Sequence, residues 1–161
     1  MAGVGVAVSF LVALFWQALL AAVPAAGFGM AFNVPVRAVL YCAGFGAFAR
    51  GLRFSLVEAG IPFELATFMA ASTTSLISVY VAQRFRAHPK VFTVAAMIPM
   101  IPGVPFFTAL IAIMEIQRKT MTPELWATAV NSGLRACLIV AALAVGLALP
   151  GLLLYRKRPV V

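Results

Sequence analysis

Acidic residues are scarce in this chain, whose 161 residues include 4 glutamates or aspartates against 12 lysines and arginines. Metal ligands and nucleophiles are equally rare, with 1 histidine and 2 cysteines, Cys42 and Cys137, both in apolar runs. Two such cysteines indicate no disulfide framework. No segment contains a metal-ligand set, or a nucleophile with a base beside it. We therefore expect a protein that is not an enzyme and holds neither a metal nor a cofactor.

Charge of either sign is also rare. Charged residues make up 10% of the sequence and hydrophobic residues 64%, whereas about a quarter of a soluble domain is charged. The composition predicts an all-α integral membrane protein that forms a single transmembrane domain over residues 1–161, without a separate soluble domain. The net charge of +8 is carried by basic residues near the ends of apolar runs. It therefore indicates membrane topology rather than nucleic-acid binding.

Five segments have the length needed to cross a bilayer, which is about 20 residues. We expect transmembrane helices at residues 4–31, 36–59, 63–82, 91–114 and 124–154. Arg50 and Arg53 interrupt the second segment, so the alternative has four spans with this segment as a re-entrant or outer loop. Pro24, Gly27 and Gly29 are expected to break or loosen the second half of the first segment.

Basic residues are distributed unevenly between the two sides of the predicted membrane. With five spans and a cytoplasmic C-terminus, the outer connections hold Arg118 and Lys119. The inner connections hold Arg37, Arg84, Arg86, Lys90, Arg156, Lys157 and Arg158. Because cytoplasmic loops are enriched in lysine and arginine, this bias predicts a cytoplasmic C-terminus and a periplasmic N-terminus.

The fourth segment is the most unusual part of the sequence. Residues 88–105 read HPKVFTVAAMIPMIPGVP, so three prolines and a glycine fall near the middle of a membrane-length run. Each proline lacks an N–H donor and leaves the carbonyl four residues earlier without its helical partner. Since lipid cannot satisfy such groups, we predict a helix broken at Pro99–Pro105, as at many transport sites. The alternative is a packed kink.

A broken helix would also create a second helix start inside the membrane. We expect Pro105 at the first position of this half-helix, where its missing N–H has no cost. The following amides, up to Thr108, would then point the positive end of the helix dipole at an anion.

Three arginines fall within the apolar segments, where a central charge costs at least about 2.5 kcal/mol on insertion scales. With no carboxylate expected among these spans, their guanidinium groups form a plausible receptor for an anionic solute, above all a carboxylate. The alternative is that they reach the outer headgroups or bond backbone carbonyls. The predicted substrate site consists of Arg50, Arg53, Pro99, Pro102, Gly103, Thr108 and Arg135.

Other polar residues have more ordinary interpretations. Gln17 is expected to face neighbouring helices. The hydroxyls of residues 72–78 are expected to bond their own helix or a neighbour, with a polar path as the alternative. His88 is interpreted as a helix-entry residue rather than a proton relay. Thr122, Pro123 and the next glutamate have the pattern of a helix N-terminus.

Three stretches resemble a known family. They are residues 27–38 (GFGMAFNVPVRA), 88–103 (HPKVFTVAAMIPMIPG) and 149–159 (LPGLLLYRKRP). Over nearly the whole chain the sequence resembles the YjjB-type small subunit of the threonine/serine exporter family. The resemblance implies a bacterial inner-membrane protein that acts with a larger YjjP-type transmembrane subunit. For this two-component branch it implies export of succinate, a dicarboxylate, and Arg53 matches an arginine expected in the branch.

Two other functions remain open at this point. The chain could belong to an exporter of threonine or serine, or it could be a scaffold that stabilises a transporting partner without contacting the substrate. The many small residues in its helices, which suit helix association, are compatible with the scaffold.

Overall fold

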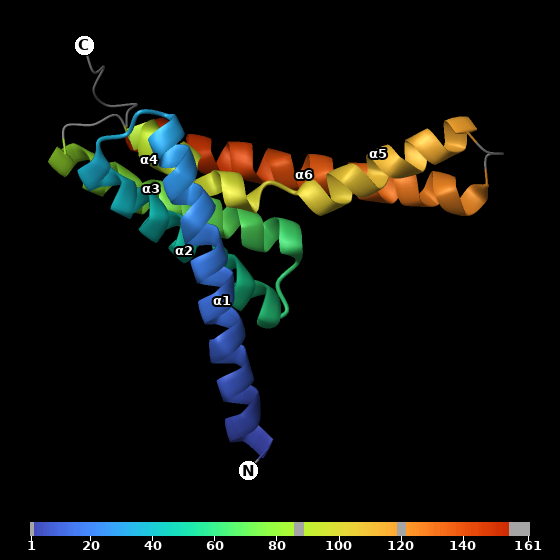
Figure 1. Ribbon diagram of the computed structural model, residues 1–161, viewed down its shortest axis with the longest axis horizontal. Coiled ribbons are helices and arrows are strands. Elements are labelled where there is room, and N and C mark those ends of the chain that lie inside the picture. Colours follow the sequence, from blue (N-terminus) through green and yellow to red (C-terminus); the bar gives the residue numbers. More distant parts are fainter. Residues whose placement is uncertain (1, 86–88, 119–121, 155–161) are drawn as a thin grey trace.

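The computed structural model describes residues 2–85, 89–118 and 122–154. Within these ranges the chain is helical and contains no β-strand (Figure 1). The elements are α1 (Ala2–Ala31), α2 (Val36–Glu58), α3 (Phe63–Phe85), α4 (Pro89–Met97), the 3-10 helix η1 (Ile98–Met100), α5 (Gly103–Arg118) and α6 (Pro123–Leu154). The predicted all-α fold is confirmed, whereas the predictions for His88 and for residues 155–159 lie outside the described residues.

Helix length and composition identify the parts suited to a membrane. Among the described residues, Ala7–Ala31 and Pro123–Leu153 are long and apolar enough to cross a bilayer. The bent pair Thr93–Met100 and Gly103–Arg118 makes a third crossing if it is counted as one span. The protein is therefore an all-α membrane protein with two clear apolar spans, and by this measure up to three.

The first two connections are tight turns. Asn33 has a φ of 56°, and the Val34 amide donates to the Gly29 carbonyl at 3.0 Å, which closes the end of α1. Gly60 has a φ of +89°, and the Ile61 amide donates to the Leu56 carbonyl at 3.1 Å. A residue in the left-handed region is a common way to end a helix, and glycine adopts it without a Cβ penalty.

Pro24 does not interrupt the first helix. It lies inside α1, which continues from Ala2 to Ala31. The expectation of a broken or loosened second half is therefore wrong: the break comes only at the turn around Asn33. The second segment forms one continuous helix, α2, which is not among the helices that length and composition identify as spans.

Small residues set the closest helix contacts. A Cβ added to Gly46 on α2 would lie 2.5 Å from the Ala25 Cβ and 3.1 Å from the Ala21 carbonyl oxygen on α1. A Cβ added to Gly146 on α6 would lie 2.7 Å from the Ala71 Cβ on α3. Such small-residue contacts are typical of membrane helices, because lipid gives apolar side chains no reason to associate.

The hydroxyls of α3 are used within the helices, as predicted. Ser72, Thr73 and Thr74 donate to the carbonyls four residues earlier, at 2.7 to 2.8 Å. Ser78 donates to the Ser75 carbonyl at 2.8 Å, and Ser75 donates across to the Leu147 carbonyl of α6 at 3.4 Å. These hydroxyls therefore bond their own helix, apart from Ser75, which joins α3 to α6.

The helices meet around the break between α4 and α5. The first turns of α1 project beyond the other helices, and α5 lies alongside α6 as a pair extending in a different direction (Figure 1). The buried core joins α2, α3, α4, η1 and α6, and includes Cys42, Ala71, Met97, Met100 and Ile139. The junction of α2, α3, η1, α5 and α6 contains the predicted site.

Candidate functional site

The helix is broken where the prolines predicted a break. After η1, Ile101 is extended, with φ −59° and ψ 135°, as expected for a residue before proline. The segments Thr93–Met100 and Gly103–Arg118 are bent by 51°. The chain satisfies two of the three carbonyls that the prolines release, since the Ile98 oxygen accepts from the Ile101 amide at 3.1 Å and the Ile101 oxygen from the Gly103 amide at 2.9 Å.

The second half-helix begins earlier than expected. α5 starts at Gly103, which makes Pro105 its third residue, and the Phe106 amide donates to the Pro102 carbonyl at 3.2 Å. The prediction that Pro105 takes the first position is therefore wrong, and the Phe106 amide is not free for an anion. Pro105 is tolerated because the first four N–H groups of a helix have no partner within it.

Arg53 binds the break directly. Its side chain comes from α2, is 3% exposed, and donates through Nη1 to the Met100 carbonyl at 3.1 Å. The guanidinium carbon lies 4.8 Å from the centre of the Phe63 ring, a cation–π distance. Arg53 thus bonds a backbone carbonyl, which is one of the alternatives expected for these arginines. The carbonyl belongs to Met100, the last residue of η1.

Arg50 lies one turn earlier on the same face of α2. It is half-buried, and its Nε donates to the Gln17 side-chain oxygen on α1 at 2.8 Å. Gln17 thus faces a neighbouring helix, as predicted. Among the described residues no carboxylate forms an ion pair with Arg50 or Arg53, so both guanidinium charges have uncharged partners.

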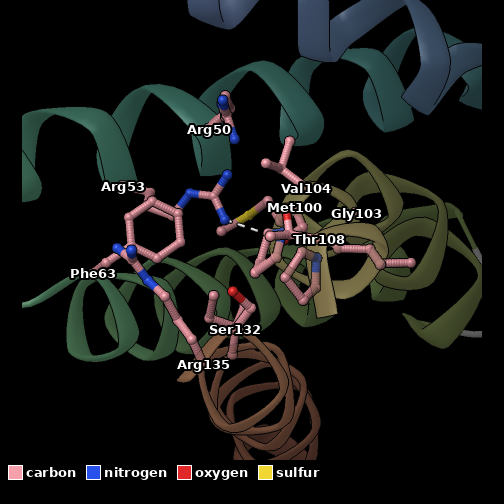
Figure 2. Close-up of a pocket in the computed structure, with 13 residues that line it drawn as sticks. Arg50, Arg53, Phe63, Met100, Gly103, Val104, Thr108, Ser132 and Arg135 are labelled. Atoms are coloured by element: carbon pink, nitrogen blue, oxygen red, sulfur yellow. Dashed lines mark hydrogen bonds between the residues drawn. The ribbon is translucent and has the colours of Figure 1, made fainter. Parts of the chain in front are cut away.

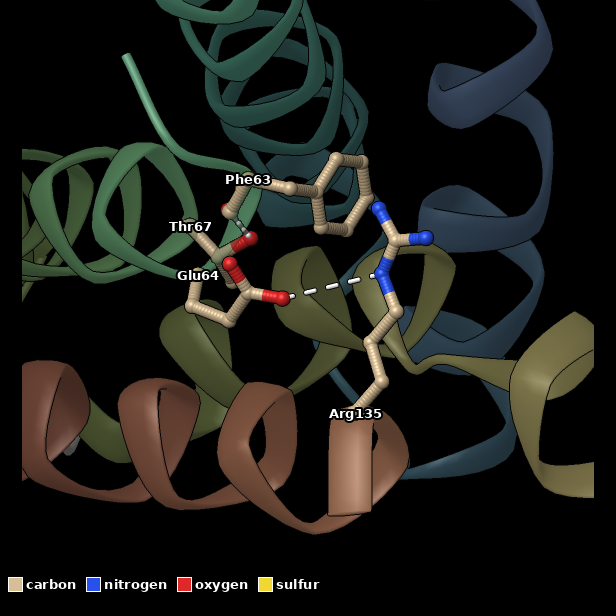
Figure 3. A network of polar contacts seen from close by, with 4 residues as sticks. All are labelled: Phe63, Glu64, Thr67 and Arg135. Atoms are coloured by element: carbon tan, nitrogen blue, oxygen red, sulfur yellow. Dashed lines mark hydrogen bonds and ion pairs between the residues drawn. The ribbon is translucent and has the colours of Figure 1, made fainter. Parts of the chain in front are cut away.

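Arg135 has a carboxylate partner. Its Nε lies 3.6 Å from a Glu64 oxygen on α3, with side chains 58% and 34% exposed (Figure 3). The guanidinium carbon also lies 5.4 Å from the Phe63 ring centre. The expectation that no carboxylate neutralises these arginines is therefore wrong for Arg135. At this exposure such a pair contributes about 0–1 kcal/mol to stability.

The three arginines line one cavity of about 390 Å³, within the usual range of small-molecule pockets. Figure 2 shows the three arginines together with Met100 and Gly103 of the break. The predicted residues that line it are Arg50, Arg53, Pro102, Gly103, Thr108 and Arg135, and the remaining walls are Phe63, Met100, Ile101, Val104, Pro105, Ser132 and Ile139. Pro99 does not belong to this set: it lines a separate cavity together with residues of α1 and α2.

Among the residues that sequence reasoning missed, three bear on the polar chemistry of this region. Phe63 contacts Arg53 and Arg135, Glu64 pairs with Arg135, and Ser132 lines the cavity. A signal for Ser132 was present, because it lies three residues before Arg135 on one helix face. Phe63 and Glu64 open α3, and only the packing of α3 on α6 brings them to the cavity.

The charge of the cavity determines what it can bind. Three guanidinium groups and the adjacent carboxylate of Glu64 leave a net charge of +2, with hydroxyls at Thr108 and Ser132. Guanidinium groups bind carboxylates through paired, charge-assisted hydrogen bonds. Apolar walls such as Ile139 strengthen these interactions by excluding water. The arrangement suits a small anion with an apolar body.

The comparison with known families gives one match. A family model described as "Threonine/Serine exporter, ThrE" matches residues 17–153. This range includes all residues of the cavity, both halves of the broken helix and Gln17. No solved structure matches the chain.

Proposed function

Because the chain belongs to the threonine/serine exporter family, we propose that it is the small subunit of a two-component exporter of succinate or a related dicarboxylate. A larger YjjP-type transmembrane subunit is the proposed partner. The family supports a membrane exporter in general. The choice of this branch rests on the resemblance of residues 27–38, 88–103 and 149–159.

The observation that carries the substrate proposal is the charge of the cavity. A dicarboxylate with two negative charges balances the net +2 left by Arg50, Arg53, Arg135 and Glu64. Arg50 and Arg53 have neutral partners and would bind one carboxylate. Arg135, on the opposite wall, would bind the other as it leaves Glu64.

The rest of the cavity suits the middle of such a solute. Phe63, Val104 and Ile139 present apolar surface to a methylene chain, while Thr108 and Ser132 can donate hydrogen bonds to carboxylate oxygens. The Met100 carbonyl fixes Arg53 before the solute arrives. A group already held in position loses less entropy on binding.

We further propose five membrane crossings, with α4, η1 and α5 as one broken span, in the bacterial inner membrane. Helices α2 and α3 have 23 residues each, about 35 Å at 1.5 Å per residue, enough for a hydrocarbon core of about 30 Å. Arg53 lowers the mean hydropathy of α2, by which a span is recognised. Its side chain, however, is 3% exposed and turned away from lipid. The excess of basic residues in the connections supports a cytoplasmic C-terminus.

An exporter of threonine or serine is the second candidate, and the description of the matching family favours it. An amino acid carries an ammonium group as well as a carboxylate. Glu64 could accept that ammonium, with Arg50 or Arg53 holding the carboxylate. The two candidates therefore assign opposite roles to Glu64.

Efflux from proteoliposomes tests the proposal. Vesicles with this chain and its partner are loaded with labelled succinate, and unlabelled succinate, threonine or serine competes. We expect succinate to compete, and Arg53→Ala and Pro102→Ala to reduce efflux at unchanged protein abundance. Arg118→Ala, at the exposed end of α5, is the matched control. Wild-type efflux in both cavity variants would contradict the proposed site, and competition by threonine alone would favour amino-acid export.

Photo-crosslinking separates transport from a scaffold role. A photoreactive dicarboxylate analogue should label this chain near the cavity, and excess succinate should prevent the labelling. Label found only on the partner subunit would instead indicate a scaffold.

A further inference from the structure

A second cavity lies against α1, α2 and η1. It measures about 340 Å³ and is lined by Gln17, Leu20, Ala21, Pro24, Arg50 and Pro99. Its walls come from α1, α2 and the break, whereas the larger cavity is formed by α2, α3, α5, α6 and the break. The two cavities therefore contact different faces of the broken helix.

Arg50 is the one residue that lines both cavities. In the structure its guanidinium is turned to the smaller cavity, where Nε donates to Gln17 at 2.8 Å. Its neighbour Arg53 is fixed to the Met100 carbonyl and lines only the larger cavity. Of the two arginines on this face of α2, Arg53 is therefore held in place, whereas Arg50 can reach both cavities.

We propose that the smaller cavity is a second carboxylate-binding site on the solute path, and that Arg50 moves the carboxylate into it from the larger cavity past Pro99 and Met100. This inference rests on the proposed function, since it requires a carboxylate in the larger cavity. The smaller cavity contributes one cation and one amide and has no carboxylate among its lining residues. It would therefore hold one carboxylate group of the solute at a time.

Gln17 suits this role because it is a neutral acceptor. A carboxylate offers the Arg50 guanidinium an opposite charge and two acceptor oxygens that can bind it in a bidentate pair, whereas Gln17 offers one neutral oxygen, so an arriving solute can take Arg50 from Gln17. When the solute leaves, Gln17 can accept from Arg50 again. The guanidinium is then never left without a partner in the membrane, where an unpaired charge is costly.

Cysteine labelling tests whether the solute reaches both cavities. Thr108→Cys reports on the larger cavity and Leu20→Cys on the smaller, in a Cys42→Ala and Cys137→Ser background that retains efflux. The probe is a small charged methanethiosulfonate reagent, with and without saturating succinate. Val23→Cys is the matched control, since Val23 and Leu20 lie on α1 with side chains 68% and 66% exposed, and Val23 does not line the cavity.

We expect succinate to slow labelling in the Thr108→Cys and Leu20→Cys variants and to leave the Val23→Cys variant unchanged. Protection in the Thr108→Cys variant alone would overturn the second site while leaving the proposed function intact. Protection at neither position would overturn both.

Gln17→Glu tests the role of Arg50. The new carboxylate would hold Arg50 in an ion pair, and freeing a charge from a pair within the membrane is unfavourable enough to slow efflux by more than about tenfold. Succinate should still protect the Thr108→Cys variant carrying this change, because the larger cavity keeps Arg53 and Arg135. Gln117→Glu, the same change at an exposed residue of α5, should have wild-type efflux. Normal efflux in Gln17→Glu would overturn the proposed role of Arg50.

Discussion

At the scale of single residues, the site depends on how each guanidinium is held. Arg53 is buried and bound to a main-chain carbonyl, Arg50 is bound to an amide, and Arg135 to a carboxylate. One cavity thus contains three arginines that are held by three different kinds of partner. The sequence predicted the arginines from their position in apolar segments, but their partners lie on other helices and depend on the packed fold.

Arg53→Lys should weaken succinate binding even though the charge is kept. A lysine ammonium cannot hold the Met100 carbonyl and present a planar pair of donors to a carboxylate at once. We expect the apparent affinity to fall by about tenfold or more, the equivalent of one charge-assisted hydrogen bond. The measurement is the succinate concentration giving half-maximal efflux, with Arg118→Lys as control. An unchanged value would contradict bidentate binding at Arg53.

Glu64→Gln should distinguish the two candidate substrates. The change releases Arg135 and raises the net charge of the site, so the affinity for succinate should rise by up to about fivefold, the worth of a half-exposed ion pair. For threonine or serine the affinity should fall, because the ammonium loses its acceptor. Competition curves for both solutes on the same vesicles give the answer. A weaker succinate affinity in this variant would count against the dicarboxylate proposal.

At the scale of the elements, the break in the fourth segment follows from the local sequence. Residues before proline avoid the helical region, so Ile101 ends η1 and α5 can begin directly after Pro102. The same reasoning predicted the break but placed the second helix start at Pro105. It overlooked that a proline is tolerated anywhere in the first turn, where no N–H has a helical partner.

The placement of Phe63 and Glu64 depends on contact between two distant helices. Their helix, α3, approaches α6 at Gly146, where the nearest groups include the Ser72 amide nitrogen at 3.1 Å and the Phe68 carbonyl oxygen at 3.2 Å from an added Cβ. Backbone atoms cannot move aside as a flexible side chain can. Nothing in the sequence indicates that this glycine faces α3, so the Arg135–Glu64 pair could not be predicted.

Gly146→Ala should therefore destabilise the protein. Overpacking of this kind costs about 1–3 kcal/mol, and we expect a lower thermal transition in detergent and reduced membrane abundance. Gly133→Ala on the same helix is the matched control, since its added Cβ would lie 3.9 Å from the Ala109 Cβ, an ordinary contact. A Gly146→Ala protein as stable as Gly133→Ala would show that α3 and α6 are not so closely packed.

At the scale of the whole molecule, much apolar surface lies outside the core. In α1, Leu11, Phe15 and Leu20 are at least 60% exposed, and in α5 Phe107 is 60% exposed. Lipid explains such surface in a membrane protein, and the proposed larger subunit would cover part of it. The composition was sufficient to predict the membrane class. Hydropathy alone could not show that Arg53 of α2 is buried and lines the cavity.

The central claim is that a carboxylate binds beside Arg53 at the broken helix. Equilibrium binding of radiolabelled succinate to the purified complex of this chain and its partner tests it most directly. We predict saturable binding to the wild type and to Arg118→Ala, and its loss in Arg53→Ala protein that remains folded and bound to its partner. Saturable succinate binding that is unchanged by Arg53→Ala would contradict the claim.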